Sequence, residues 1–225
     1  MRLLAFSSVA LASAFALSSP ARADNVTFTG FAHGSKTVNF SLSSPNGVKS
    51  GSVNAGGFST VLNGGPSFVS YCVDLYQTIN FGTPYSDYTA PGTSHAFTND
   101  RAYADLGRLY ATVGSGVDTS VEEAAFQIAV WEIAYEDSSN PYALGTGAAR
   151  FSGGSASPAA LSLASSWLTG LGGGPGYDIR VIESRSHQDV IFAPVPEPSS
   201  VALLLAGLVA TGGFARRAQR RNEKR

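Results

Sequence analysis

The sequence predicts an α+β fold with an antiparallel, sandwich-like or barrel-like β-sheet, a central helical segment and a C-terminal transmembrane helix. Three observations lead to this prediction. Apolar and polar side chains alternate in the first and last thirds of the chain, as they do in half-buried strands. The middle third changes to helical spacing. Near the C-terminus, an uncharged apolar run is long enough to cross a thin bilayer.

The strands of the first third are predicted from alternation and from turn residues. Residues 26–29 and 38–42 alternate apolar and polar side chains, and the Asn-Gly dipeptide at 46–47 is a hairpin-turn signal. A further strand is predicted at residues 68–75. Its odd positions form a continuous apolar face, and Cys72 lies on the opposite face.

Helices are predicted in the middle third, where apolar residues change to helical spacing and Gly or Pro residues end the segments. The first covers residues 100–113 and the third covers residues 158–168. Between them, residues 121–136 follow a predicted capping box of Ser120 and Glu123.

The last third returns to strands, predicted at residues 177–183 and 189–192. A polar turn joins them. Because strands stand on both sides of the helical segment, we expect the first and last strands to share one antiparallel sheet system.

The N-terminus has the three parts of a signal peptide. A short basic region precedes an apolar stretch at residues 4–17, and Ala21 and Ala23 form a small-x-small cleavage site. We expect signal peptidase to cleave after Ala23 and to remove residues 1–23. The ectodomain, residues 24–193, is long enough for one domain with a sizeable core.

The C-terminal segment combines a proline-rich triplet, an apolar run and a basic cluster. Proline fixes φ and removes a backbone donor, so the triplet ends the preceding domain. Residues 199–215 carry no charge, and the basic residues behind them stop transfer and hold that end in the cytoplasm. The triplet is Pro196, Glu197 and Pro198, and the stop-transfer cluster begins with Arg216 and Arg217.

This order of parts resembles the PEP-CTERM sorting signal of Gram-negative bacteria. In that family an exosortase, a membrane protease-transpeptidase, recognises the signal and processes the protein at the cell envelope. The resemblance implies that residues 194–225 are a sorting signal and that the protein is an exosortase substrate. It also implies export, transient anchoring in the inner membrane by the C-terminal helix, and a final place on the envelope, on the outer surface or outside the cell.

The charge and composition limit the function classes. Residues 24–193 hold 7 Lys and Arg against 14 Asp and Glu, a net charge of −7, whereas the whole chain has a net charge of −1. An acidic domain is not expected to bind nucleic acid or anionic lipid. The 25 glycines together with 11% aromatic residues fit a loop-rich β protein with a packed core.

The chain has one cysteine, Cys72, which cannot form an internal disulfide. It could be a small apolar side chain in the core, or it could form an intermolecular disulfide. A third interpretation involves Gln127, which shares a helical face with Trp131 and needs partners for its amide if buried. If the thiol meets the Gln127 carbonyl carbon, ammonia is expelled and an internal thioester forms, which can later acylate an amine or hydroxyl on another surface.

The same residues resemble the thioester domains of bacterial surface adhesins. That family has an aromatic-Cys-aliphatic motif on a strand and a Gln-x-Ala-aliphatic-Trp motif further on, as at Tyr71-Cys72 and at Gln127 to Trp131 here. The resemblance implies that Cys72 supplies the thiol and Gln127 the acyl group, and that Trp131 packs beside them. Tyr71 and Asp74 would belong to the surroundings of the bond.

From these features we expect an exosortase-sorted protein for surface attachment, covalent through the thioester, with a surface amine or hydroxyl as its target. The alternative is a non-covalent structural protein of an exopolysaccharide or biofilm matrix. A secreted hydrolase is a third hypothesis, but the sequence shows neither a catalytic-triad motif nor metal-ligand spacing. We therefore expect no enzymatic activity, no catalytic residues, no bound metal and no cofactor. A solvent-exposed acidic helix face is expected at Glu122, Glu123, Glu132 and Glu136.

Overall fold

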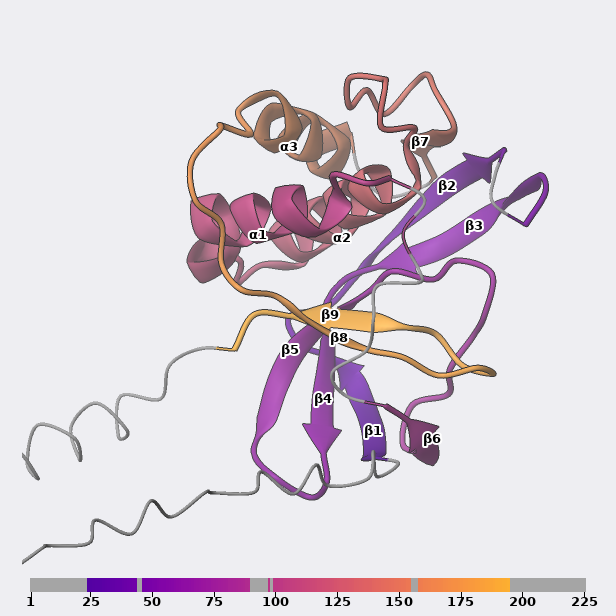
Figure 1. The fold of residues 1–225 in the computed structure, drawn as a ribbon. Coiled ribbons are helices and arrows are strands. Elements are labelled where there is room, and N and C mark those ends of the chain that lie inside the picture. The colour runs from indigo at the N-terminus through magenta and orange to yellow at the C-terminus, as the bar shows by residue number, and fades with distance from the viewer. Residues whose placement is uncertain (1–23, 44–45, 90–96, 98, 155–157, 195–225) are drawn as a thin grey trace, which may run out of the picture.

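Two antiparallel sheets and three α-helices make up the part of the chain that the computed structural model describes (Figure 1). The described residues are 24–43, 46–89, 97, 99–154 and 158–194. The predicted signal peptide and the predicted C-terminal transmembrane helix lie outside these ranges. Within them, none of the helices combines the length and the apolar character needed to cross a membrane.

The larger sheet is antiparallel throughout and joins the two ends of the domain. Its strand order is β6-β1-β4-β5-β9-β8. The sheet curls into a half-barrel below the helices in Figure 1. Because the first and last strands lie in this one sheet, the predicted sharing of a sheet is confirmed. The strands are β1 (Asp24–Phe31), β4 (Phe58–Leu62), β5 (Ser67–Cys72), β6 (Pro84–Tyr88), β8 (Arg180–Ile182) and β9 (Val190–Phe192).

The smaller sheet has the order β3-β2-β7. β2 (Lys36–Leu42) and β3 (Lys49–Ala55) form the predicted hairpin, and Gly47 in its turn has a φ of 92°, which glycine adopts without steric cost. β7 (Ala149–Gly153) pairs with the other edge of β2 and is not predicted from the sequence. β7 is a five-residue strand between two helices. Its own residues do not indicate a strand, and its conformation depends on pairing with β2.

The helices confirm the change of period in the middle third. α1 (Ala102–Val113) and α3 (Pro158–Thr169) lie within two residues of the predicted bounds, and the short 3₁₀ turn η1 (Gly114–Gly116) follows α1. α2 (Ser120–Tyr135) begins and ends one residue earlier than predicted. In Figure 1 the three helices pack together above the larger sheet.

The N-cap of α2 is Thr119, so the predicted capping box is wrong by one residue. Thr119 Oγ1 accepts a hydrogen bond from the backbone N–H of Glu122 at 3.3 Å, and Glu122 Oε2 accepts one from the backbone N–H of Thr119 at 3.0 Å. Both Thr119 and Ser120 are followed by glutamate three residues later, which made the two registers alike in sequence. The observed register directs the side chain of Glu123 into the protein.

α2 is the centre of the core. Every residue from 123 to 135 is buried, and the helix contacts α1, α3 and strands of both sheets. A helix that is covered on all sides has no solvated face. The predicted exposed acidic face is therefore wrong for the three glutamates that have no exposed surface, which are Glu123, Glu132 and Glu136.

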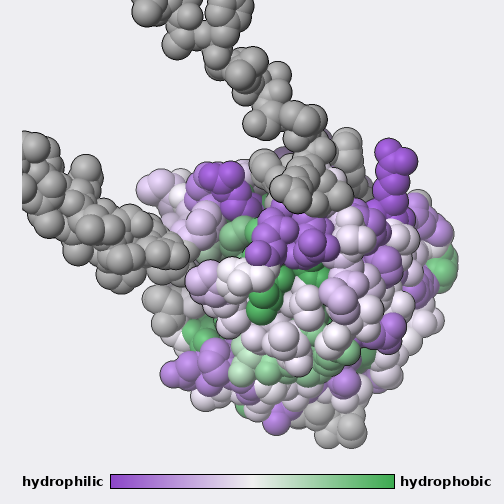
Figure 2. All heavy atoms as spheres, turned by 90° about the horizontal axis from the view of Figure 1, so that it is seen from below, coloured by the Kyte–Doolittle hydropathy of each residue, from purple (hydrophilic) through white to green (hydrophobic). Residues whose placement is uncertain are grey.

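The face of the molecule that is seen from below mixes polar and apolar side chains. Figure 2, which views the molecule from below, shows hydrophobic side chains exposed between scattered hydrophilic ones. This mixture agrees with the low charged fraction of 14% in the whole sequence.

Candidate functional site

The structure brings Cys72 and Gln127 into direct contact. The backbone N–H of Cys72 donates a hydrogen bond to Gln127 Oε1 at 3.0 Å, and Gln127 Nε2 donates one to the backbone oxygen of Cys72 at 2.7 Å. Cys72 has no exposed surface and Gln127 is 1% exposed. The amide of Gln127 is therefore fixed beside the thiol-bearing residue in a site without water access.

The contact exists because β5 runs beyond the end of its neighbour. β4 begins at Phe58, which pairs with Ser70, so β4 offers no partner to Cys72 on that side. On the other side β9 pairs with β5, and the N–H of Val73 donates to the backbone oxygen of Asp189. Successive residues of a strand direct their N–H groups to opposite sides. The N–H of Cys72 therefore points to the side of β5 on which β4 has already ended. The amide of Gln127 occupies the position that a β4 residue would otherwise take.

The thiol of Cys72 lies inside the core. Its Sγ donates to the backbone oxygen of Asp74 at 3.1 Å. Burial, and next the negative charge of Asp74, raise the pKa of Cys72 well above its usual value, so the protonated thiol is the resting form. Both Cys72 and its neighbour Tyr71 are buried. The strand is thus covered on both faces, whereas the sequence predicts one apolar face directed away from Cys72.

Trp131 lies one helical turn after Gln127, and its side chain is 1% exposed. Its ring stacks on Phe151, with centroids 6.1 Å apart and planes at 13°. Among the described residues, its indole N–H has no hydrogen-bond partner that meets normal geometry. Trp131 acts to lower the pKa of Cys72, but the effect of burial is larger and the pKa stays raised.

Asp74 shapes the chain after Cys72. Its Oδ1 accepts a hydrogen bond from the backbone N–H of Tyr76 at 2.7 Å, which closes an Asx turn. The N–H of Leu75 donates to the hydroxyl of Tyr135 on α2 at 2.8 Å. Asp74 therefore orients the backbone carbonyl that receives the thiol hydrogen bond, and its own pKa is raised by burial.

A second buried side chain of α2 binds the sheet one turn before Gln127. Glu123 Oε2 accepts a hydrogen bond from the N–H of Gly57 at 2.9 Å, and Oε1 lies 2.6 Å from Nδ1 of His33. Burial, and next the negative charge of Glu123, raise the pKa of Tyr71. Sequence reasoning missed this cluster because its members are far apart in the chain. Glu123 lies four residues before Gln127 and therefore on the same helix face, and this spacing is the signal that could have indicated a buried glutamate.

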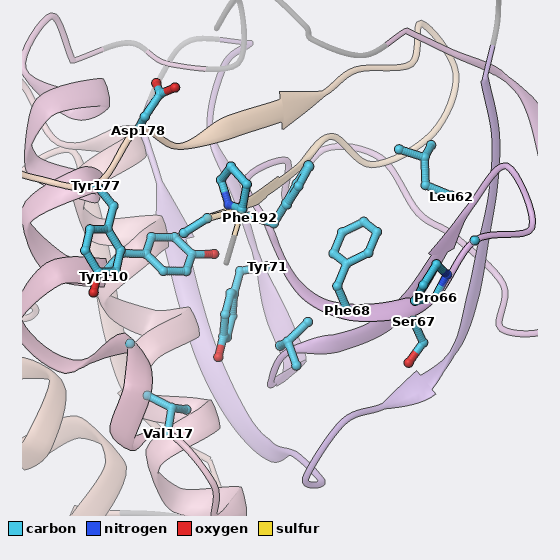
Figure 3. Close-up of a pocket in the computed structure, with 15 residues that line it drawn as sticks. Leu62, Pro66, Ser67, Phe68, Tyr71, Tyr110, Val117, Tyr177, Asp178 and Phe192 are labelled. Atoms are coloured by element: carbon cyan, nitrogen blue, oxygen red, sulfur yellow. The ribbon is translucent and has the colours of Figure 1, made fainter. Parts of the chain in front are cut away.

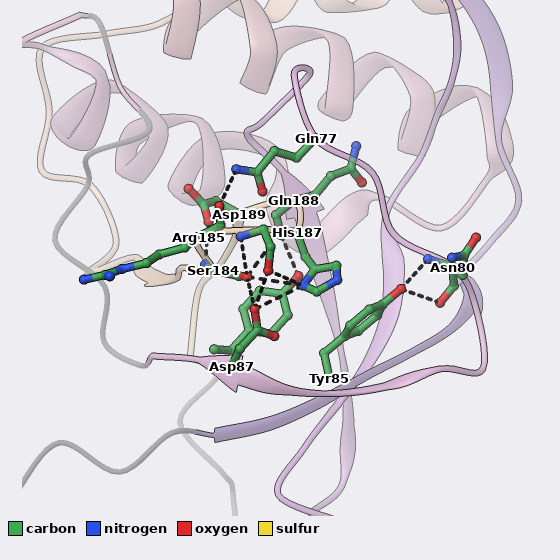
Figure 4. A network of polar contacts seen from close by, with 11 residues as sticks. Gln77, Asn80, Tyr85, Asp87, Ser184, Arg185, His187, Gln188 and Asp189 are labelled. Atoms are coloured by element: carbon green, nitrogen blue, oxygen red, sulfur yellow. Dashed lines mark hydrogen bonds and ion pairs between the residues drawn. The ribbon is translucent and has the colours of Figure 1, made fainter.

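A polar cluster joins β6 to the β8–β9 loop (Figure 4). Asp87 Oδ2 accepts hydrogen bonds from the hydroxyls of Ser184 at 2.7 Å and Ser186 at 2.8 Å, and lies 3.2 Å from His187 Nδ1. Burial raises the pKa of Asp87, but these hydrogen bonds outweigh it and leave the pKa below its usual value.

This cluster contains the residue types of a catalytic triad, but its geometry differs. In a triad the imidazole bridges the carboxylate and the hydroxyl through its two different nitrogens. Here Asp87, Ser184 and Ser186 all approach Nδ1 of His187. The arrangement fixes the β8–β9 loop to β6. In the described part of the chain, no group of three or more His, Cys, Asp or Glu side chains is placed to hold a metal ion.

An apolar groove of about 920 Å³ opens between β5, β9 and the end of α1 (Figure 3). Phe68 and Phe192 form one wall, with ring centroids 4.5 Å apart. Tyr71, Tyr110 and Tyr177 line the opposite part. The last described residues of the chain, 193 and 194, also belong to its lining.

Comparison with known proteins identifies the segment that begins at this groove. Residues 194–221 match the family model described as the PEP-CTERM protein-sorting motif. No curated protein and no solved structure matches the chain. The comparisons therefore give no support to the resemblance between the ectodomain and adhesin thioester domains. The chain carries a PEP-CTERM sorting signal, and it is an exosortase substrate that is exported and transiently anchored in the membrane.

Proposed function

We propose that the exported domain attaches the cell envelope to other surfaces through an internal thioester between Cys72 Sγ and Gln127 Cδ. The observation that supports this function is the pair of hydrogen bonds that hold the Gln127 amide against Cys72 in a fully buried site. The sorting signal delivers the domain to a compartment in which such a bond has external targets.

The reaction needs no oxidant and no cofactor. Cys72 Sγ attacks Cδ of Gln127, the bond from Cδ to Nε2 breaks, and Nε2 leaves as ammonia with the thiol proton. Negative charge develops on Oε1 during the attack, and the backbone N–H of Cys72 already donates to this atom. Bond formation also replaces the contact between the thiol and the Asp74 carbonyl.

Burial protects the product. A thioester is an electrophile that water destroys, and both residues of this pair are at most 1% exposed. A target amine or hydroxyl reaches Cδ only when the covering residues open locally. Its attack breaks the C–S bond, transfers the Gln127 acyl group to the target and regenerates the Cys72 thiol.

Methylamine labelling tests this function on the purified mature protein. A thioester predicts incorporation of one methylamine at Gln127, located by peptide mass spectrometry, and loss of the label in Cys72→Ala. Gln77, whose side chain donates to the backbone oxygen of Arg185, is the control and stays unlabelled. Absence of label at Gln127 in protein unfolded in the presence of methylamine would contradict the proposal.

A second candidate is a non-covalent structural protein of the extracellular matrix. The Gln127 amide already accepts one hydrogen bond and donates another, and the thiol donates a hydrogen bond to the backbone oxygen of Asp74. These contacts satisfy both side chains without a covalent bond, which favours a purely structural role. This candidate predicts that Cys72→Ala leaves surface attachment of whole cells unchanged. The thioester proposal predicts loss of attachment in the same variant.

A further inference from the structure

The apolar groove ends where the sorting signal begins. Its lining includes Ala193 and Pro194, and the next residues are Val195 and the Pro196–Pro198 triplet. No linker separates the groove from this segment. The segment is therefore present at a high effective concentration beside the groove before any other ligand arrives.

The lining of the groove suits an apolar chain better than a sugar or a nucleotide. Tyr110 donates its hydroxyl to the backbone oxygen of Ile191, and Tyr71 is only 4% exposed. The Tyr110 hydroxyl is thus occupied inside the fold. What the groove offers are ring surfaces, together with the apolar pair of Phe68 and Phe192 (Figure 3).

The segment that leaves the groove has matching chemistry. Its prolines at 194, 196 and 198 restrict the backbone to extended, polyproline-like conformations, which bind in aromatic grooves at low entropic cost. In that conformation residues 195–198 span about 12 Å, at ~3.1 Å per residue. The charged residue that lines the groove is Asp178, which pairs with Arg180 at 3.7 Å, so its negative charge is partly offset where the segment carries Glu197.

We propose that the groove binds residues 195–198 of the same chain and thereby shields the sorting triplet from the exosortase. The folded domain and the enzyme then compete for one segment. Processing proceeds from the fraction of molecules in which the segment has left the groove, so the strength of this contact sets the rate of processing.

Photo-crosslinking in the full-length chain tests the contact. Tyr177 lines the groove and its side chain is 55% exposed, so a p-benzoylphenylalanine at this position does not disturb the core. In cells without the exosortase, we expect an intramolecular crosslink from this position to residues 195–200. The control position is Phe81, which is 42% exposed and lies outside the groove lining, and it gives no crosslink to that segment.

Other occupants would overturn the proposal. These outcomes are a crosslink from position 177 to a second copy of the chain, to the exosortase or to polysaccharide, or the absence of any crosslink to the tail. A pulse-chase measurement in cells with the exosortase tests shielding. Tyr177→Ser is expected to speed processing several-fold at unchanged thermal stability, and an unchanged or slower rate would contradict competition.

Discussion

The side-chain amide of Gln127 takes the place of a neighbouring strand beside Cys72. It donates to the carbonyl and accepts from the N–H of the same residue, at 2.7 and 3.0 Å. α2 is thereby attached to the larger sheet at the point where β4 has ended. One turn earlier, Glu123 makes the equivalent contact with the N–H of Gly57.

Removing the Gln127 amide should destabilise the domain strongly. In a Cys72→Ala background, which cannot form a thioester, Gln127→Ala leaves two buried backbone groups without partners. The expected loss is about 3 kcal/mol in the free energy of unfolding, measured by urea denaturation. Gln77→Ala, which removes one exposed hydrogen bond, is the control and should cost less than about 1 kcal/mol. Similar losses for the two variants would contradict the strand-like role of Gln127.

The capping register of α2 can be tested with two neighbouring alanines. Thr119→Ala removes the observed N-cap and should cost about 1 kcal/mol, whereas Ser120→Ala should be close to neutral. Thermal unfolding of the two variants measures the difference. A larger loss of stability in Ser120→Ala than in Thr119→Ala would instead support the predicted capping box of Ser120 and Glu123.

Stability should fall as the pH rises from 5 to 8. Burial raises the pKa of Glu132 to about 8, and its Oε2 is buried without a hydrogen-bond partner among the described residues. Between pH 5 and 8 the folded protein therefore binds a proton at this carboxyl that the unfolded chain has already released. Because the folded state binds more protons, the free energy of unfolding decreases as the pH rises. Burial raises the pKa of Asp189 to about 7, which acts in the same direction.

The Glu132→Gln variant isolates the first of these groups. Its amide is neutral at every pH, so the decrease between pH 5 and 8 should shrink by an amount on the order of 3 kcal/mol. Urea titrations at both pH values give the comparison. An equal change between pH 5 and 8 in the wild type and in Glu132→Gln would contradict a protonated Glu132 in the folded protein.

Gly147 should tolerate no side chain. Its φ is 85°, and a Cβ there would overlap the carboxylate of Glu136. That carboxylate is buried and accepts hydrogen bonds from the N–H groups of Asp137 and Ala148. We expect Gly147→Ala to cost about 3 kcal/mol in thermal or urea unfolding.

Gly145 is the matched control for this prediction. It lies in the same loop, and a Cβ at this position would meet no atom within 4 Å. Gly145→Ala should change the stability by less than about 0.5 kcal/mol. Equal effects at the two positions would mean that the loop adapts and that Glu136 does not require Gly147.

The sequence predicted the helices and the strands β1, β2, β5, β8 and β9 because their signals are local, but it did not predict β4 or β6. Spacing, caps and Gly or Pro punctuation lie within each segment, as for α3. β7 was missed because its strand conformation comes from pairing with β2, more than a hundred residues earlier. The burial of Glu123 was missed for the same reason, because its partners His33 and Gly57 come from distant parts of the chain.

The candidate site could be predicted in part. The sequence placed Gln127 among apolar and aromatic neighbours and required partners for its amide, and the structure supplies them at Cys72. The kind of contact was not predictable, since it depends on where β4 ends relative to β5. The groove was not predictable either, because it is formed by side chains from four separate parts of the chain.

The intact mass of the mature protein, purified without nucleophilic buffers, tests the central claim most directly. A thioester between Cys72 and Gln127 predicts a mass one ammonia below that of the processed sequence, and a return to the full sequence mass in Cys72→Ala after allowance for the substitution. A wild-type mass equal to the processed sequence would contradict the thioester and leave Gln127 with a purely structural role.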